Sequence, residues 1–190
     1  TFCDAGIFSF GVDKVISSVR GGAAYAKDSK IAEKLQQAQK NLPEMGMFTI
    51  QKHLGQPLLF ATGKFFYPIF IGKILLYLCK KFHITPRVVE DSEKRAKKPF
   101  WFPVKMPNAL AHLAYSQLQN LSKNNEHRRT IAKFYETNLP KAFTKPTILP
   151  ESSPIYLRYP LQSENRNQFH QKAKSAGIFL GDWYDTAVAP

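Results

Sequence analysis

The sequence has few cysteines and no recognisable metal motif. Cys3 and Cys79 are the only cysteines among the 190 residues. Two cysteines placed this way make neither the disulfide framework of a small secreted domain nor the paired spacing of a zinc site. The five histidines also lack the spacing of metal ligands, and no Ser-His-Asp or Cys-His signature stands out. These absences favour a reducing, cytoplasmic setting and predict no metal site.

Acidic residues are scarce compared with basic ones. The chain has 27 lysines and arginines against 14 aspartates and glutamates, which gives a net charge of +13. Such an excess attracts anionic partners, and the candidates are nucleotide-sugar phosphates, anionic lipid headgroups and nucleic acid. The basic residues are spread along the chain rather than gathered in a motif, so nucleic acid ranks last. A hydrophobic content of 44% and an aromatic content of 13% exclude a disordered chain.

An uninterrupted apolar run of membrane-spanning length is also missing. Lys64, Pro68, Gly72 and Lys73 interrupt the most apolar stretch, residues 54–84, whereas a spanning helix needs ~20 mostly apolar residues. The stretch instead predicts an interfacial hairpin or a pair of short helices, with aromatic rings at headgroup depth and lysines at the phosphates. An equally weighted alternative is a helical insertion that packs on the body of the protein or on a second copy. The residues concerned are Phe60, Phe65, Phe66, Tyr67, Phe70 and Tyr77, with Lys64, Lys73, Lys80 and Lys81.

The most informative stretch that is present surrounds Lys14, near the N-terminus. A short apolar run ends in the turn Ser9-Phe10-Gly11, Lys14 follows, and Gly21-Gly22 opens a second apolar run. This pattern predicts two strands joined by a tight connection that presents one lysine. In an apolar surrounding, desolvation favours the free amine, which is the nucleophilic form of lysine. A lysine beside a glycine-rich turn is more often an ordinary solvated residue, so a chemical role for Lys14 needs support from other segments.

The stretch resembles the lysine segment of the DegT/DnrJ/StrS-type sugar aminotransferases. Their pattern is Ser-Phe, three residues, Lys, six residues and Gly-Gly, and it is matched here by Ser9-Phe10, Lys14 and Gly21-Gly22. The resemblance implies that Lys14 forms the Schiff base with pyridoxal 5'-phosphate and that the Ser9 hydroxyl binds the cofactor phosphate. Members often carry Asn after the lysine and an acidic residue before Gly-Gly, where this chain has Val15 and Arg20. These departures indicate a divergent branch.

A second segment, later in the chain, resembles the same family. A long helical region follows the aromatic and proline-rich run 99–103, with an apolar stripe from Leu110 to Leu121. It resembles the family's Arg-Met, Ala and Gln-Leu helix with its Glu-Arg-Arg continuation. The matching residues are Lys105-Met106, Ala111, Gln117-Leu118 and His127-Arg128-Arg129. Pro103 stands where members often have an Asn that reaches the neighbouring subunit's cofactor phosphate, so no phosphate role is carried over to it.

Other elements are predicted from periodicity and capping residues. Residues 22–26 are predicted as a strand, and Asp28 or Ser29 caps a helix that ends at Asn41-Leu42-Pro43. The charged run 90–98 is predicted as a solvated loop or a basic flank.

In the last fifty residues the pattern alternates between strand and helix. Residues 147–149, 155–161 and 178–181 are predicted as strands, and a helix begins at Asn165-Arg166 with Gly177 after its end. The resemblance implies that Trp183 and Tyr184 lie in an aromatic loop that points toward the substrate. Packing of these two side chains at an interface is slightly favoured over contact with the substrate.

The resemblance implies an α/β chain of the pyridoxal-phosphate-dependent transferase fold type I. Residues 1–45 are predicted to end the large cofactor-binding domain, 46–98 to form an apolar and basic helical insertion, and 99–190 to form the small C-terminal α+β domain. By resemblance the phosphate-binding loop, the ring-stacking aromatic residue and the acidic partner of the pyridine nitrogen lie upstream of Thr1. We therefore expect a fragment that is inactive alone.

The resemblance implies an aminotransferase that moves an amino group, usually from glutamate, to a nucleotide-linked keto sugar. Such a reaction serves polysaccharide or amino-sugar biosynthesis, and members are homodimers that share active sites. The alternative is a peripheral membrane-binding module that acts through residues 54–84 and has a degenerate cofactor site. The first hypothesis predicts a cytoplasmic protein, and the second predicts one at the inner face of the membrane.

Overall fold

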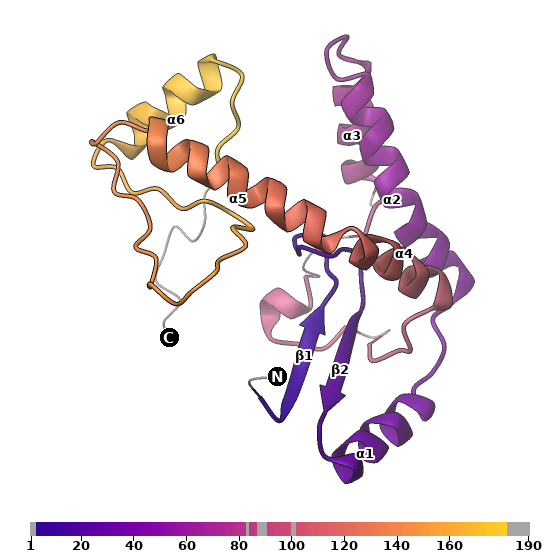
Figure 1. Ribbon diagram of the computed structural model, residues 1–190. Helices are drawn as coiled ribbons and strands as arrows, with labels where there is room; N and C mark the ends of the chain where they lie inside the picture. The colour runs from indigo at the N-terminus through magenta and orange to yellow at the C-terminus, as the bar shows by residue number, and fades with distance from the viewer. Residues whose placement is uncertain (1–2, 83, 87–90, 100–101, 182–190) are drawn as a thin grey trace. The chain divides into compact units, whose positions relative to one another are not determined.

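A computed structural model describes residues 3–82, 84–86, 91–99 and 102–181. The chain divides into two compact units, residues 1–122 and 123–190, and each is described by itself. Helices dominate the described residues, and the strands β1 and β2 form a two-stranded sheet (Figure 1). The three-part division into 1–45, 46–98 and 99–190 stays a prediction.

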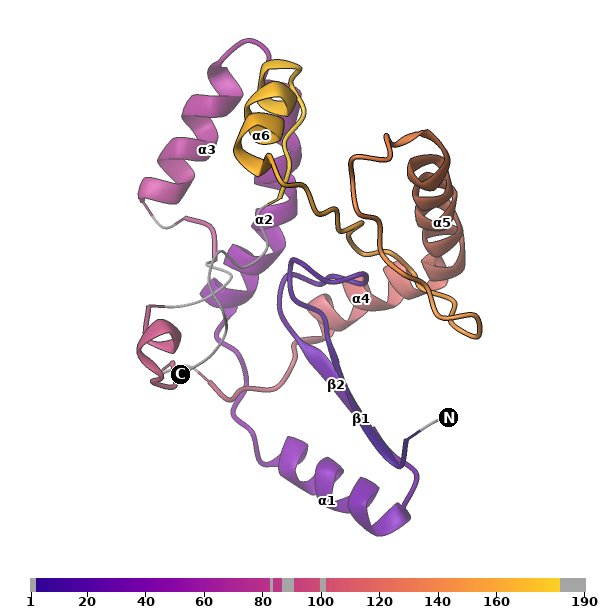
Figure 2. The ribbon, with the colours of Figure 1, turned by 90° about the vertical axis from the view of Figure 1, so that its left-hand side faces the viewer.

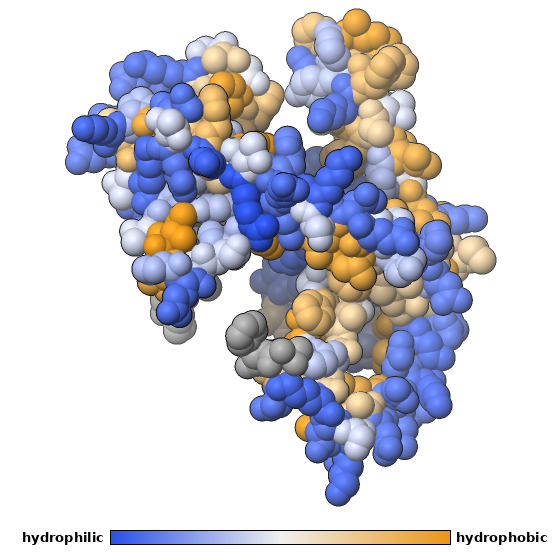
Figure 3. Space-filling model, viewed as in Figure 1, coloured by the Kyte–Doolittle hydropathy of each residue, from blue (hydrophilic) through white to orange (hydrophobic). Residues whose placement is uncertain are grey.

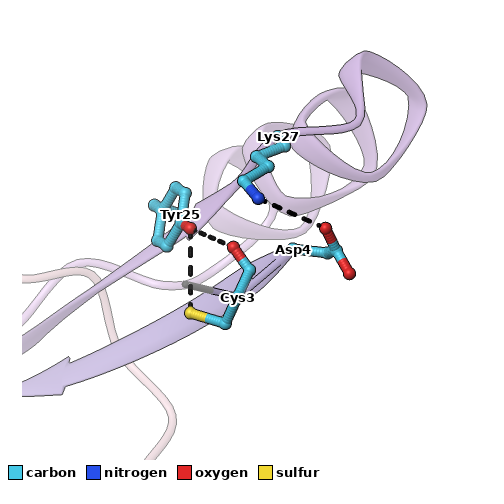
Figure 4. A network of polar contacts seen from close by, with 4 residues as sticks. All are labelled: Cys3, Asp4, Tyr25 and Lys27. Carbon is cyan, nitrogen blue, oxygen red and sulfur yellow. Dashed lines mark hydrogen bonds and ion pairs between the residues drawn. The ribbon is translucent and has the colours of Figure 1, made fainter. Parts of the chain in front are cut away.

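Two antiparallel strands carry the lysine stretch. β1 (Ala5–Ser9) pairs with β2 (Gly22–Ala26), in a register that runs from Ala5 opposite Ala26 to Ser9 opposite Gly22. Both strands confirm the prediction. At the end away from the connection, Tyr25 Oη donates to the carbonyl of Cys3, and Lys27 Nζ lies 3.4 Å from Asp4 Oδ1 (Figure 4). These contacts close the open end of the strand pair.

Helix α1 (Ser29–Lys40) follows β2 directly. Asp28 is its N-cap, because its Oδ1 accepts the backbone N–H of Ile31 at 3.0 Å. The helix ends before Asn41, as the proline at position 43 predicts. In Figures 1 and 2, α1 lies at the Tyr25 end of the strand pair, away from the connection that carries Lys14.

The apolar stretch folds into two helices, α2 (Met47–Phe65) and α3 (Ile71–Lys81), which pack on each other as a hairpin (Figure 2). The predicted pair of helices is confirmed, although α2 begins earlier than expected. The helices approach closely at two glycines: a Cβ at Gly72 would overlap the carbonyl oxygen of Gly63, and one at Gly63 would lie 2.6 Å from Leu76. Among the described residues, no helix has the length and apolarity needed to cross a membrane.

The end of the first unit is built around α4 (Asn108–Gln119). The described part of the charged run before it, residues 91–98, contains turns and the short 3-10 helix η1 (Glu93–Arg95). Leu110 is fully buried, and Ala114, one turn later on the same face, is also buried. Helix α4 contacts α2, and Figures 1 and 2 show it at the connection end of the strand pair. It is therefore placed to touch the residues around Lys14.

The second unit contains most of α5 (Leu121–Asn138) and all of α6 (Arg166–Ser175). Helix α6 begins after Asn165, and Gly177 beyond its end has a φ of +74°, as a helix C-terminus requires. This helix is confirmed. The segment between the helices is held by ring contacts, with centroids 4.7 Å apart for Phe143 and Phe169 and 5.4 Å apart for Tyr135 and Tyr159.

A tyrosine pair joins the loop of this unit to α5. Tyr156 Oη donates to Glu136 Oε1 at 3.3 Å, and the rings of Tyr156 and Tyr159 lie 5.7 Å apart. Partial burial raises the pKa of both phenols, and the charge of Glu136 raises the pKa of each further. The neutral form of both tyrosines is therefore the form that the folded unit favours.

The predicted strands at 147–149, 155–161 and 178–181 are wrong. Within the described residues, this unit has only an isolated antiparallel bridge between Thr144 and Gln162. A strand needs a neighbour for its backbone groups, and the prolines at 150, 154 and 160 lack the N–H that a ladder uses. Tyr156 also has a φ of +47°, which no strand residue adopts.

Candidate functional site

The connection between β1 and β2 is a compact loop rather than an open excursion. Phe10 N–H donates to the carbonyl of Gly21 at 2.9 Å, which extends the strand pairing by one step. Lys14 N–H donates to the carbonyl of Gly11 at 3.1 Å, so residues 11–14 form a tight turn. Ser18 N–H donates to the carbonyl of Phe10 at 3.0 Å, which closes the loop. Lys14 therefore lies in a loop with a fixed backbone path.

Three polar side chains gather around Gly11. A Cβ at this position would lie 3.3 Å from Asp13 Oδ1, 3.7 Å from Ser9 Oγ and 4.0 Å from Lys14 Cγ. The first of these distances is tighter than ordinary van der Waals contact, so a larger residue would crowd the group. The structure thus brings the two predicted site residues, Ser9 and Lys14, to the same small area and adds Asp13 to them.

Lys14 is more open to solvent than the sequence suggested. Its side chain is 42% exposed, and its Nζ forms an ion pair with Asp13 Oδ2 at 3.2 Å. The prediction of an apolar surrounding for Lys14 is wrong for the described residues, because the adjacent carboxylate is its charged partner. Ser9 Oγ accepts the N–H of Gly11 at a long 3.5 Å, which leaves the hydroxyl proton for another acceptor.

Gln117 on α4 holds the far side of the connection. Its Oε1 accepts the N–H of Ser17 at 3.1 Å, and its Nε2 donates to the carbonyl of the same residue. One side chain thus satisfies both polar groups of a peptide segment 100 residues away. The sequence singled out Gln117 as part of a family-like helix, but no local signal could show that it clamps the lysine connection.

The Gly21-Gly22 pair is required by close packing. Gly21 has a φ of +130°, and a Cβ there would lie 2.7 Å from Met106 Sδ. A Cβ at Gly22 would lie 2.6 Å from the carbonyl oxygen of Phe8 on the facing strand β1. The two family-like segments of the sequence, one with Gly-Gly and one with Met106, therefore touch in the structure.

The backbone between Ser17 and Gly21 is strained. Val19 is almost fully buried and has a φ of +71°, a region that β-branched residues rarely adopt. Its N–H donates to Ser17 Oγ at 3.2 Å, and the fully buried Ser18 donates its hydroxyl to the carbonyl of Arg20 at 2.9 Å. The surrounding hydrogen bonds hold this conformation. Such strain is common at functional sites.

A cavity of about 460 Å³ opens beside the connection. Ser9 and Asp13 line it, and Lys14 itself is not among the described lining residues. Other walls come from the strand ends, η1, the segment before α4 and α4 itself. They include Arg20, Gly21, Glu93, Lys105, Met106 and Leu110. The volume suits a small organic ligand with a charged group.

The sequence also predicted substrate contacts near the C-terminus. Trp183 and Tyr184 lie outside the described residues, so their role stays a prediction. The described part of the segment before them, Leu180 and Gly181, lines a separate cavity of about 720 Å³ in the second unit, together with Arg158 and Arg166. Across the described residues, no group of three or more His, Cys, Asp or Glu is placed to hold a metal ion.

Comparison with known families places the chain among transferases of amino groups. Residues 75–189, more than half of the chain, match the profile of the DegT/DnrJ/EryC1/StrS aminotransferase family. The chain belongs to this family. No match was found among curated proteins or among solved structures. Membership implies fold type I, and the observed mixture of helices with a small two-stranded sheet is consistent with part of that fold.

The residues around Gly11 fit pyridoxal 5'-phosphate chemically. Lys14 offers a primary amine for an aldehyde, and Ser9 offers a hydroxyl proton for a phosphate oxygen. The missing Cβ at position 11 leaves room beside Ser9 Oγ and the Lys14 side chain at its Cγ. The matched segment begins after Lys14, but Met106 and Gln117 lie within it and touch the lysine connection directly.

Proposed function

We propose that the chain supplies the lysine segment of a pyridoxal-phosphate-dependent aminotransferase, with Lys14 as the residue that bonds to the cofactor. The observation that carries this proposal is the contact between the lysine connection and the family-matched segment: Gln117 clamps Ser17, and Met106 covers Gly21. A segment that belongs to an aminotransferase family thus positions the one lysine whose spacing resembles that family's reactive lysine.

Each residue of the site has a role in this proposal. Ser9 Oγ binds the cofactor phosphate, and Lys14 Nζ carries the proton between the amino donor and the cofactor. Asp13 Oδ2, 3.2 Å from Lys14 Nζ, holds the lysine side chain near the connection. When bound, the cofactor supplies an electron sink for the carbon that bears the amino group. Gln117 keeps the connection in place while these groups react.

We further propose glutamate as the amino donor and a nucleotide-linked keto sugar as the acceptor, in polysaccharide or amino-sugar biosynthesis. Resemblance supports the sugar class, and the net charge of +13 favours an acceptor that carries phosphates over a neutral one. By the same resemblance the active protein is a homodimer, and the scarcity of cysteine favours a cytoplasmic setting.

The decisive experiment traps the bond to Lys14 in the whole protein that contains this chain. Absorption spectra are recorded with pyridoxal phosphate before and after borohydride reduction, and the labelled peptide is mapped. Lys27→Ala is a matched control for Lys14→Ala, because Lys27 is 44% exposed and pairs with Asp4 at 3.4 Å. We expect the label on the peptide that holds Lys14, its loss in Lys14→Ala, and its retention in the control.

Label on another lysine, or equal labelling of both alanine variants, contradicts the proposed role of Lys14. The acceptor is tested next with glutamate and two keto sugars, one linked to a nucleotide and one free. Transfer to the linked sugar alone supports the proposed substrate class. Equal transfer to both contradicts the requirement for phosphates.

A further inference from the structure

Helix α2 of the hairpin buries two polar side chains and exposes large apolar ones. His53 and Gln56 of α2 are only 3% and 5% exposed, whereas Leu58 and Phe65 of the same helix are 71% and 78% exposed. An amphipathic helix in water does the opposite and buries its apolar face. The outward face of this hairpin is therefore built to meet something other than water.

Many of the exposed apolar side chains lie on one face of each helix and on the turn between them. On α2 they follow helical spacing in one stripe, on α3 they form a second stripe, and residues of the turn lie between the two. Phe48, Phe60 and Tyr77 are also exposed but lie off these stripes. We call the two stripes with the turn the hairpin surface. It consists of Met47, Leu54, Leu58, Phe65, Phe66, Tyr67, Ile69, Phe70, Ile71, Ile74 and Leu78, all exposed. In Figure 3 apolar residues gather at this end of the first unit.

The ionised side chains of the hairpin's two helices are all lysines. The sequence contains no Asp or Glu between Glu44 and Glu90, whereas five lysines lie in the two helices. These are Lys52, Lys64, Lys73, Lys80 and Lys81. Lys73 contacts the turn between the helices, where its Nζ is 4.1 Å from the ring centre of Phe70 and 5.0 Å from that of Tyr67. Positive charge thus borders the apolar surface.

We propose that the hairpin surface docks on an anionic lipid bilayer, with its apolar side chains at headgroup depth and its lysines at the lipid phosphates. Helices that bind at a membrane interface have an apolar face beside cationic side chains, and the hairpin has exposed apolar residues together with lysines. Two copies of the chain would instead bring lysines against lysines with no acidic partner from the hairpin. The surface thus complements a negative bilayer better than it complements itself. The proposal goes beyond the aminotransferase activity and does not depend on it.

Sedimentation with vesicles tests the apolar part of the surface in the whole protein. The probes are phosphatidylcholine vesicles with and without one-quarter phosphatidylglycerol. Leu58→Ser with Phe65→Ser is compared with Leu149→Ser with Phe179→Ser, because the second pair is equally exposed at 71% and 77% but lies in the other unit. We expect binding to the anionic vesicles to weaken by about tenfold or more in the hairpin pair. The control pair should bind like the unchanged protein.

The same assay tests the charged part with a second matched pair. Lys80→Gln with Lys81→Gln removes two exposed cations from the last turn of α3, and Lys172→Gln with Lys174→Gln removes two from the last turn of α6. Each lysine near an anionic surface contributes about fivefold to binding, so the α3 pair should weaken it by about tenfold or more. The α6 pair should change it little. Circular dichroism checks that all variants keep their helices.

Three results would overturn the proposal. The first is no binding to either vesicle, and the second is equal binding to neutral and anionic vesicles. The third is an oligomer that dissociates in Leu58→Ser with Phe65→Ser while vesicles bind neither protein, which would assign the surface to a second copy. The borohydride experiment on Lys14 has its own readout, so failure of one proposal leaves the other unaffected.

Discussion

Different kinds of contact stabilise the interior of each of the two compact units. In the first unit, backbone meets backbone: β1 pairs with β2, and Gly63 and Gly72 bring two helices close together. In the second, aromatic side chains hold a long loop that has almost no backbone pairing of its own. Substitutions at the close backbone contacts of the first unit should therefore lower the free energy of unfolding strongly. Loss of a single side-chain group in the second unit should lower it only a little.

The largest expected effect is at the close helix contact. Gly72→Ala places a methyl group on the carbonyl oxygen of Gly63 and 2.6 Å from the backbone nitrogen of Tyr67. Because backbone cannot move aside as a side chain can, we expect the free energy of unfolding to fall by about 3 kcal/mol. Urea unfolding measures this change. Gly55→Ala on α2 is the control, because nothing lies within 4 Å of its Cβ.

In the control we expect a gain of about 0.5–1 kcal/mol, since alanine is the better helix former. An equal loss in Gly72→Ala and Gly55→Ala would show that the hairpin is not close-packed at this point.

A smaller effect is expected where a side chain holds the backbone of the first unit. Gln117→Ala leaves the partly buried N–H and carbonyl of Ser17 without their partner, which costs about 2 kcal/mol. The proposed role of Lys14 adds a second readout, because a loosened connection should weaken the reducible bond to the cofactor. Gln119 is exposed on the same helix, so Gln119→Ala should change neither the free energy of unfolding nor the labelling of Lys14. If Gln117→Ala kept the full free energy of unfolding and the full borohydride label on Lys14, Gln117 would not hold the connection in place.

The smallest effects are expected in the second unit, from two neighbouring tyrosines. Tyr156→Phe removes the hydrogen bond to Glu136 and should cost about 1 kcal/mol at neutral pH. Tyr159→Phe removes a buried hydroxyl that has no hydrogen-bond partner among the described residues, so stability should stay equal or rise. Thermal unfolding of both variants measures the difference. A larger loss of stability in Tyr159→Phe than in Tyr156→Phe would contradict this prediction.

These tyrosines also predict how stability depends on pH. The folded unit raises the pKa of both phenols above the ordinary value of 10.0. Their contribution to stability is therefore complete below pH 10 and is lost as pH rises through the raised folded pKa. Either Tyr→Phe variant should lose less stability than the unchanged protein on going from pH 9 to above pH 10. The same loss in all three proteins would show that the tyrosines do not titrate this way.

The elements that sequence patterns predicted well are those with local causes. The N-cap Asp28, the proline after α1 and the glycine after α6 each act on residues within one helical turn. The strand predictions at 147–149, 155–161 and 178–181 failed because a short apolar segment forms a strand only where a second strand lies beside it. In the described residues of the second unit, that neighbour is missing, and aromatic packing takes its place.

The candidate site was predictable only in part. The spacing of Ser9 and Lys14 identified two residues that lie together around Gly11, and the resemblance that it carries agrees with the family match. Neither the ion pair with Asp13 nor the positive φ of Val19 follows from a pattern. Both depend on the three-dimensional path of the connection, which Gln117 fixes from far along the chain.

The clamp between Ser17 and Gln117 has a consequence for how the protein is made. The two residues are 100 positions apart, and a ribosome adds about 5–20 residues per second. The lysine connection is therefore synthesised about 5–20 s before its clamp exists, whereas both helices of the hairpin are complete well before residue 117. Long-range contacts also form late because they require closure of a long loop. The lysine segment accordingly reaches its final shape only after the hairpin has been made.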